Sequence, residues 1–396
     1  MTTESPATGS VAIRTVVAAT FASTLAILPA FLVGALAVTI RQDLGFSRSG
    51  LGVVVAAFWL VMAVTGAPGG RAVQRMGASR SIRAASVGSL ISLLAASTSR
   101  SLIQLVLWLV VGGLASGIAQ PAADLALARA VPTLRRGLAF GIKQASVPGA
   151  ALIAGIAVPT LAQTLGWRWA FVIGSAMALP PLIWMPGLEA SVGLRSSGRY
   201  LTNPSKTVWW LAGSVGLAMF AVAAMGAFYV ESSVAAGVDV GTAGTLLAMG
   251  SVFGIAGRLL FAWKLGEVSR PFSVTAGLVM VGGLATLSFG LGPTGIGLIA
   301  ATVIAFGSAW GFNGLFTHAV VRANPMKAAQ ASGIIVVGAA SGGALGPLLF
   351  GILVESSSFS TAWTLAAGAL LGAGALMLFV SNREKIASVG PLSDSN

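Results

Sequence analysis

Long uninterrupted apolar runs constrain this chain more than any other feature. A bilayer core about 30 Å thick is crossed by roughly 20 apolar residues in an α-helix, and the sequence holds twelve runs of this kind. The runs lack the alternation of a membrane β-strand. The pattern therefore predicts an all-α integral membrane protein with twelve transmembrane helices. The predicted spans are 16–40, 48–70, 82–99, 102–128, 138–165, 168–185, 208–235, 241–263, 271–292, 295–321, 329–354 and 361–380.

The scarcity of charge supports this fold class. Charged residues make up 8% of the chain, against about 25% in a soluble domain, and the mean hydropathy is +0.91. A soluble enzyme and a disordered chain are both excluded. The sequence has no cysteine, so disulfides and thiolate chemistry are excluded as well. The N-terminal stretch lacks the features of a cleaved signal peptide, and the first apolar run is expected to remain as a helix.

The positive charge follows the expected topology. The chain has 23 lysines and arginines and a net charge of +13. Only four of them fall in odd-numbered loops, namely Arg41, Arg48, Arg100 and Arg168. By the positive-inside rule both termini are cytoplasmic, and we expect a multi-pass monomer in a bacterial inner membrane. Contact with acidic membrane lipid is a sufficient role for the excess charge, so no nucleic-acid partner is expected.

A weak internal repeat divides the chain. The stretch LARAVP at 127–132 recurs as VVRANP at 320–325, an offset of 193 residues, and the longest polar gap follows the sixth span. The predicted parts are an N-terminal six-helix half over 1–187, a cytoplasmic linker over 188–207, a C-terminal six-helix half over 208–380 and a cytoplasmic tail over 381–396. Two parallel six-helix halves around a midplane site are an architecture of transporters.

The stretch GGRAVQRMGASRS at 69–81 resembles the signature loop of the major facilitator superfamily. In that family the loop latches the two halves together on the cytoplasmic side. Gln74 stands where the family has an aspartate, which implies a weaker charge contact here, and a basic loop that only fixes topology is the alternative. The positions concerned are Gly70, Arg71, Gln74, Arg75, Gly77 and Arg80. The resemblance implies the major facilitator fold with two pseudo-symmetric halves.

Two further stretches are similar to one branch of this family. RRGLAFGIKQASVPGAAL at 135–152 and ASGIIVVGAASGGALGPLLFGILVE at 331–355 resemble bacterial permeases of the cyanate permease type and their organic-anion relatives. Drug/proton antiporters of the family carry a Gly-Pro motif in the fifth span. That motif is missing from the fifth span of this sequence, which disfavours an exporter.

One lysine, Lys143, lies inside a predicted span. A charge at membrane depth costs roughly 2.5–3.5 kcal/mol, so this lysine needs a partner. Asp124 and Lys143 lie equally far from the middle of the turn between spans four and five, so they reach the same depth on adjacent antiparallel helices. We expect an ion pair that serves substrate binding or coupling. A structural pin for the hairpin and a lysine that reaches the cytoplasmic surface are the alternatives.

Other polar residues map to the same level. The repeat places Asp124 opposite Thr317, next to His318, the only histidine, and the resemblance implies that spans four and ten border a central cavity. Gln120 maps in the same way onto Asn313, although hydrogen bonds between helices would explain both amides equally well. The predicted substrate-binding residues are Lys143, Gln120, Asn313, Gln144 and Tyr229, and the candidates for proton coupling are Asp124, His318 and Glu231.

Two charged residues lie near the ends of spans in the C-terminal half. Glu231, about one turn from the outer end of span seven, is interpreted as an outer gate or proton acceptor that pairs with Arg41, or else as an acid bonded to interfacial water. Arg258, near the inner end of span eight, is interpreted as a gating and topology residue rather than a ligand.

Motifs for metal, nucleotide or covalent chemistry are absent from the sequence. It has no HExxH, no GxSxG and no Walker loop, so we expect no cofactor, no metal and no enzyme. Energy must then come from an ion or substrate gradient. We predict a secondary transporter that moves a small organic anion by alternating access, with proton symport, uniport and exchange left open. An efflux carrier and a non-transporting membrane sensor are the alternatives.

Overall fold

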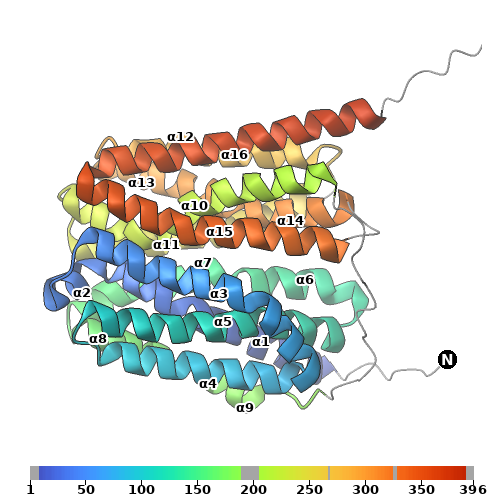
Figure 1. The fold of residues 1–396 in the computed structure, drawn as a ribbon, viewed down its shortest axis with the longest axis horizontal. Coiled ribbons are helices and arrows are strands. Elements are labelled where there is room, and N and C mark those ends of the chain that lie inside the picture. The colour runs from blue at the N-terminus through green and yellow to red at the C-terminus, as the bar shows by residue number, and fades with distance from the viewer. Residues whose placement is uncertain (1–8, 189–204, 266–267, 324–327, 389–396) are drawn as a thin grey trace, which may run out of the picture.

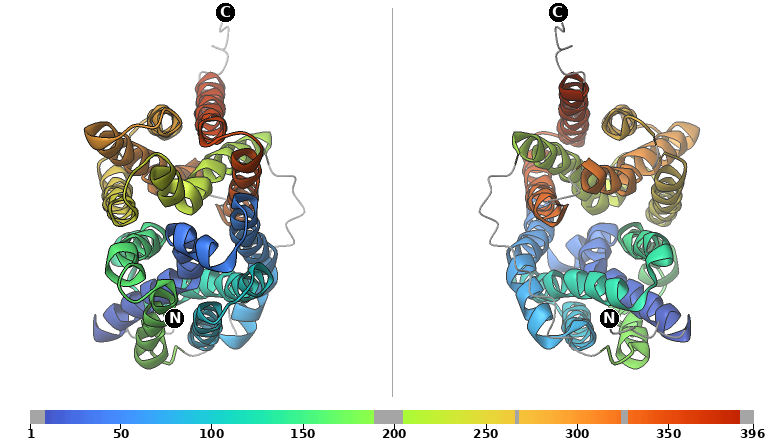
Figure 2. Two further views of the ribbon diagram at one scale, coloured as in Figure 1. Left: turned by 90° about the vertical axis from the view of Figure 1, so that its left-hand side faces the viewer. Right: turned by 90° about the vertical axis from the view of Figure 1, so that its right-hand side faces the viewer.

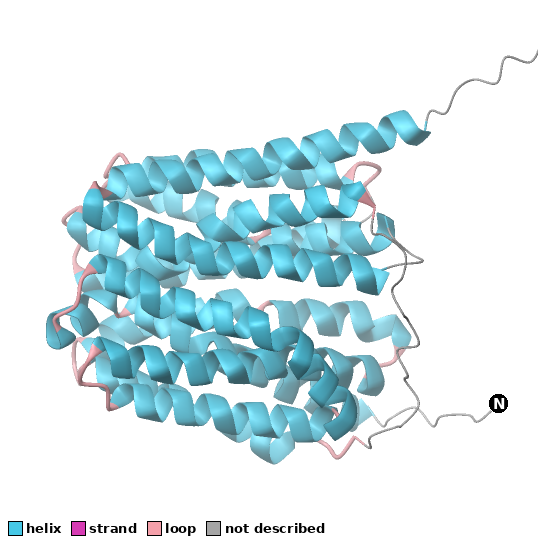
Figure 3. Ribbon diagram, viewed as in Figure 1, coloured by secondary structure: helices cyan, strands magenta, loops and turns pink. Residues whose placement is uncertain are grey.

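The computed structural model describes residues 9–188, 205–265, 268–323 and 328–388, and these form a bundle of helices (Figure 1). The described residues contain helices, turns and loops but no strand (Figure 3). The elements of the first half of the chain are α1 (Gly9–Ala35), α2 (Ala37–Leu44), α3 (Arg48–Met76), α4 (Ala78–Ser97), α5 (Leu102–Ala130), α6 (Thr133–Gln144), α7 (Ser146–Ala157), η1 (Val158–Ala162), α8 (Trp167–Ser175), η2 (Ala176–Ala178) and α9 (Leu179–Trp184). Those of the second half are α10 (Lys206–Ala235), α11 (Val240–Leu265), α12 (Pro271–Phe289), α13 (Gly295–Ala305), η3 (Phe306–Trp310), α14 (Phe312–Ala323), α15 (Ala328–Ser356) and α16 (Phe359–Ser388).

Membrane-spanning length and hydropathy recur along the whole chain. Within the described residues, 10 helices are long and apolar enough to cross a bilayer. The 20-residue helix α4 and the broken pair α8–α9 lie where the third and sixth spans are predicted. The protein is therefore the all-α integral membrane protein that the sequence predicts, with helices at all twelve expected places.

The helices form two groups, α1–α9 and α10–α16, which lie side by side (Figure 2). The start of α1 and the end of α16 lie at one end of the bundle, which we call the terminal end (Figure 1). Helix α2 lies at the opposite end, which we call the distal end (Figure 1). In α1 and α10, 78% and 72% of the most apolar window is buried, against 39–56% in the other spans. These two helices therefore form the centre of the bundle, one from each group.

Four predicted spans are interrupted rather than continuous, the first of them at Leu36 between α1 and α2. The fifth is divided into α6, α7 and the π-helical turn η1, the sixth into α8, η2 and α9, and the tenth into α13, the π-helical turn η3 and α14. The break after α6 has a covalent cause. Pro148 has no N–H to donate to the carbonyl of Gln144 four residues earlier, so the ladder of helical hydrogen bonds is open at that carbonyl.

The prediction that the signature stretch 69–81 forms a loop is wrong, because most of it is helical. Gly70, Arg71, Gln74 and Arg75 belong to the last turns of α3, which runs to Met76, and Arg80 belongs to α4. Only Gly77 separates the two helices, with φ 83° and ψ 157°. That backbone conformation is open to glycine and costs about 1–3 kcal/mol in other residues. One glycine is thus sufficient to reverse the direction of the chain.

Several other predicted boundaries shift. Helix α1 begins and ends earlier than the span 16–40, since α2 forms a separate short helix. Helix α16 continues to Ser388, well into the predicted tail 381–396, and α10 begins at Lys206, inside the predicted linker 188–207. The rest of that linker and the end of that tail lie outside the described residues.

Small residues bring the two groups into close contact towards the distal end. A Cβ added to Gly34 of α1 would lie 2.8 Å from the Cα of Ala227 in α10, and one added to Gly155 of α7 would lie 2.7 Å from the nitrogen of Ala248 in α11. Gly52 of α3 meets the backbone of α15 in the same way. Such small residues let helix backbones approach closely, which favours association inside a membrane.

We expect Gly77→Ala to lower the melting temperature of the purified protein by a few degrees, because alanine is strained at the positive φ of this turn. Gly70→Ala is the matched control, since Gly70 is helical and an added Cβ would meet open space. Thermal unfolding of both variants in the same detergent checks this. Equal melting temperatures for Gly77→Ala and the unchanged protein would contradict the assignment of the turn to Gly77.

Candidate functional site

The predicted intramembrane ion pair is present. The Lys143 ammonium on α6 lies 3.0 Å from Oδ1 of Asp124 on α5. The Lys143 side chain is 5% exposed, whereas that of Asp124 is 49% exposed. This burial contradicts the alternative in which the lysine extends to the surface. The pair is asymmetric, since the cation is enclosed while its partner carboxylate can be reached from outside.

Arg258 on α11 lies where the two groups of helices meet. Its side chain is buried, and it donates from Nη1 to the carbonyl of Gln144, 2.7 Å away, and from Nε to the carbonyl of Trp310, 2.9 Å away. Gln144 ends α6 in the first group, and Trp310 ends η3 in the second. The carbonyl of Gln144 is the one that Pro148 leaves without an intrahelical donor. Arg258 thus bonds backbone groups at two helix breaks, one in each group.

The side-chain amides predicted to bind substrate make no hydrogen bond to Lys143, Asp124 or Arg258 in the described part of the chain. Gln120, Gln144 and Asn313 have half-buried side chains. Asn313 on α14 accepts at its carbonyl from the Thr317 hydroxyl, 2.9 Å away. His318 is exposed on the same helix. Of the three residues predicted to lie together, only Lys143 and Asp124 are in contact. His318 is not bonded to either of them in the described chain.

Tyr229 occupies a packing position in the second group. Its side chain is buried, its hydroxyl hydrogen-bonds to that of Thr302, and its ring meets the edges of Phe289 at 5.4 Å and Phe306 at 5.3 Å between centroids. The three partners lie on α12, α13 and η3. The tyrosine therefore points into the core of the second group and is not among the residues lining the distal cavity described next.

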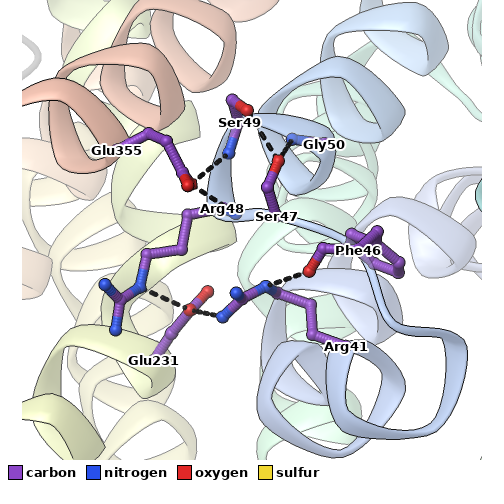
Figure 4. Close-up of polar contacts among 8 residues, drawn as sticks. All are labelled: Arg41, Phe46, Ser47, Arg48, Ser49, Gly50, Glu231 and Glu355. Atoms are coloured by element: carbon purple, nitrogen blue, oxygen red, sulfur yellow. Dashed lines mark hydrogen bonds and ion pairs between the residues drawn. The ribbon is translucent and has the colours of Figure 1, made fainter.

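A cluster of ions joins the two groups at the distal end (Figure 4). Glu231 of α10 forms an ion pair with Arg41 of α2 through Oε1, and the same oxygen accepts from Nε of Arg48, 3.1 Å away. The Glu231 side chain is 4% exposed. Its other oxygen, Oε2, is buried and has no recorded partner among the described residues. The predicted contact with Arg41 is confirmed, and Arg48 is a partner that the sequence did not reveal.

A second carboxylate completes the distal cluster. Glu355 of α15 accepts hydrogen bonds from the backbone N–H groups of Arg48, 2.9 Å away, and Ser49, 3.4 Å away (Figure 4). These N–H groups begin α3, and a helix N-terminus favours negative charge. A cavity of about 280 Å³ adjoins the cluster and is lined by Val38, Arg41, Gln42, Arg48, Glu231, Val234 and Ala235. The distal end is thus held by two carboxylates of the second group: Glu231 pairs with the side chains of Arg41 and Arg48, and Glu355 bonds the backbone at the start of α3.

Comparison with known proteins identifies the family to which this architecture belongs. Residues 19–347 match the model of the family described as Major Facilitator Superfamily. The chain belongs to this family. Its members are carriers rather than enzymes.

Two curated relatives and one solved structure illustrate the similarity. An uncharacterized MFS-type transporter of Mycobacterium tuberculosis is 26% identical over 289 residues, which are 68% of this chain and 63% of the relative's length. A probable sulfoacetate transporter of Cupriavidus necator is 24% identical over 377 residues, 86% of this chain and 87% of that protein. A bacterial homologue of the human lysosomal transporter Spinster, solved in an inward-facing and occupied conformation, has a TM-score of 0.70 at 18% identity and covers 94% of this chain and 96% of its own.

The signature residues of the major facilitator superfamily face outward here. Arg71, Gln74, Arg75 and Arg80 are exposed, and no hydrogen bond or ion pair is recorded for them among the described residues. The implied latch at the terminal end is therefore not formed in this structure. Among the described residues, the recorded hydrogen bonds and ion pairs that join the two groups lie instead at the distal end and at Arg258.

An ion pair within one group offers a comparison for the distal cluster. Arg168 lies 2.6 Å from Asp43, which also accepts from the indole of Trp167, 3.1 Å away. All three residues belong to the first group of helices. The hydrogen bonds from Arg168 and Trp167 lower the pKa of the Asp43 carboxyl. The pair is strong locally but does not bridge the groups.

We expect Glu231→Gln to separate the groups at the distal end. The substitution leaves Arg41 and Arg48 close together without a counter-charge, and breaking a buried pair in this way costs about 3–5 kcal/mol. Because the chain has no cysteine, spin labels on Thr98→Cys and Ala236→Cys report the distance between the groups in nanodiscs. The Glu231→Gln protein should show a longer distance.

Asp43→Asn is the control for this experiment, since it breaks an ion pair at the same end of the bundle but within one group. We expect its distance distribution to match that of the labelled parent protein. Identical distributions for the Glu231→Gln protein and the parent would refute the gating role of Glu231.

Proposed function

We propose that this protein is a secondary transporter that moves a small organic anion across a bacterial inner membrane by alternating access. The buried ammonium of Lys143, whose partner Asp124 is itself half exposed, carries the proposal. A fixed cation inside an apolar bundle attracts an anion more strongly than it would in water, because the effective dielectric is lower. The cation remains enclosed, while the carboxylate that balances it is open to exchange.

The distribution of charge supports the orientation. Arg41, Arg48, Arg100 and Arg168 lie at the distal end, in or beside the connections between helices. Among the described residues, most of the other lysines and arginines lie towards the terminal end. The positive-inside rule then makes the terminal end cytoplasmic, with both termini inside the cell. In this orientation the Glu231 cluster closes the outer side. Outward opening requires that cluster to break and the signature residues of the inner side to meet the other group.

Proton coupling follows from an exchange of partners at Lys143. When Asp124 takes up a proton it no longer attracts the ammonium, and a carboxylate or sulfonate of the substrate can replace it. Release of the substrate restores the original pair after the proton leaves. In such a cycle Asp124 takes up the proton and Lys143 binds the substrate, so that the two events are linked. A transporter with this cycle is a proton symporter. The half-buried side-chain amides of Gln120, Gln144 and Asn313 are the groups that we assign to orient the substrate by hydrogen bonds.

The named relative supports the class of substrate. The Cupriavidus necator protein is a probable sulfoacetate transporter and covers most of this chain at 24% identity. Sulfoacetate is a compact organic anion with a carboxylate and a sulfonate. Both groups accept hydrogen bonds and pair with buried cations. We therefore place the substrate of this protein among small carboxylates and sulfonates.

We expect Lys143→Gln to reduce uptake of the transported anion by at least about tenfold, because the substitution removes the charge that attracts it. The measurement is uptake of sulfoacetate and of a panel of small carboxylates into proteoliposomes, with and without a pH gradient. Lys264→Gln is the matched control, since Lys264 is exposed and rests on the ring of Trp263. Undiminished uptake by Lys143→Gln would rule out the role of this lysine.

Asp124→Asn tests the coupling separately. We expect this variant to lose the acceleration of uptake by an inwardly directed proton gradient, because an amide cannot carry the proton. Equal acceleration in this variant and in the unchanged protein would move the coupling site elsewhere, with His318 the next residue to test.

A further inference from the structure

Arg258 is a buried cation without a negatively charged partner. Three of the buried side chains recorded in the structure are charged, namely Lys143, Glu231 and Arg258. Lys143 has Asp124 and Glu231 has two arginines. No carboxylate lies within ion-pairing distance of Arg258 in the described part of the chain. The positive charge of this one residue is therefore left unbalanced.

The hydrogen bonds of Arg258 account for only part of its capacity. A guanidinium has five N–H donors and stays charged at physiological pH. Two donors reach the carbonyls of Gln144 and Trp310. These carbonyls supply partial negative charge from two helix breaks, but they leave the net charge in place. A buried charge that is hydrogen-bonded but unpaired remains costly, and an anion would remove that cost.

Trp310 supplies a second, independent sign of a missing acceptor. Its side chain is fully buried, and its indole Nε1 has no hydrogen-bond partner among the described residues. An unsatisfied buried N–H is rare and costs about 1–3 kcal/mol. The backbone carbonyl of the same residue accepts from Arg258. An unpaired cation and an unpaired N–H donor thus occur on two residues in direct contact.

The location of Arg258 between the two groups of helices fits a substrate site that alternating access would open to each side of the membrane in turn. Arg258 contacts the first group through Gln144 and the second through Trp310, and the Trp310 ring meets Phe31 of α1 across the groups, 5.7 Å between centroids. Gln144 directly follows Lys143 in α6. The π-helical turn η3 ends at Trp310, and such turns are frequent at functional sites. A ligand held here would touch the elements that must move past one another.

We propose that Arg258 binds the anionic group of the substrate, with the planar guanidinium accepting a carboxylate or sulfonate. This inference rests on the proposed function and refines it. Arg258 supplies the unpaired charge that attracts the anion, and Lys143 becomes available as a second cation only when Asp124 is protonated. The ligand class is a compact organic anion whose carboxylate or sulfonate oxygens replace the missing acceptor at Arg258 and Trp310.

The test is binding of sulfoacetate and malonate to the purified full-length protein, with uncharged malonamide as the comparison ligand. Thermal stabilisation and calorimetry give the affinity. We expect Arg258→Gln to weaken anion binding by about thirtyfold or more, the usual effect of removing one partner of a buried charged contact. Arg258→Lys keeps the charge but loses the planar fork, and we expect a smaller loss. Malonamide should not stabilise any of these proteins.

Arg136→Gln is the matched control, since Arg136 donates from Nε to the carbonyl of Val131, 2.9 Å away and within one group. Its affinity should equal that of the unchanged protein. If Arg258→Gln binds the anions within twofold of the unchanged protein, Arg258 is only a structural contact and the inference is overturned. If Arg258→Gln does not fold, Arg258→Lys decides in the same way, and an unchanged affinity overturns the inference.

A failure of the proposed function would look different. In that case neither sulfoacetate nor any other anion of the uptake panel would bind to the unchanged protein. Binding by the unchanged protein together with equal binding by Arg258→Gln would leave the transporter in place and remove only the role of Arg258.

Discussion

A charge inside an apolar bundle must find a polar partner, and this requirement shapes the centre of the protein. Lys143 meets Asp124, Glu231 meets Arg41, and Arg258 meets two backbone carbonyls. The first pair lies within one group of helices, whereas the other two sets of contacts join the groups. Because a desolvated charge that loses its partner is destabilised by several kcal/mol, each of these contacts can act as a switch. In the proposed alternating-access cycle, the partner that each charge has decides which arrangement of the helices is stable.

Backbone geometry provides the other half of these contacts. Pro148 leaves the carbonyl of Gln144 without a helical donor, and the π-helical turn ending at Trp310 presents a second carbonyl to the same guanidinium. At the distal end, Gly34 lets α1 approach α10 closely, and the ion cluster lies beyond that contact. Apolar contact between small residues and polar contact between charges thus occur together. The small residues allow the two groups to pack closely, and the ion pairs stabilise that close packing only while their charges are present.

The sequence predicts the fold class and one ion pair well because both follow from local rules. Run length and hydropathy define the spans, and the constant rise of a helix places Asp124 and Lys143 at one depth. The sequence does not show which carbonyls a helix break releases or which residue reaches them, since that depends on packing between distant segments. For that reason the sequence indicates a gating and topology role for Arg258 but not its bonds to two backbone carbonyls. The role of Glu355 at the start of α3 was missed for the same reason, although an acid after span eleven and the basic loop before α3 were both visible.

The unbalanced charge of Arg258 is tested most directly by a structure determined in lipid nanodiscs with saturating sulfoacetate. We predict density for the anion within hydrogen-bonding distance of the Arg258 guanidinium, between the two groups of helices, with the Trp310 indole as a further donor. An anion resolved elsewhere in the bundle, with Arg258 still bonded only to the carbonyls of Gln144 and Trp310, would contradict it.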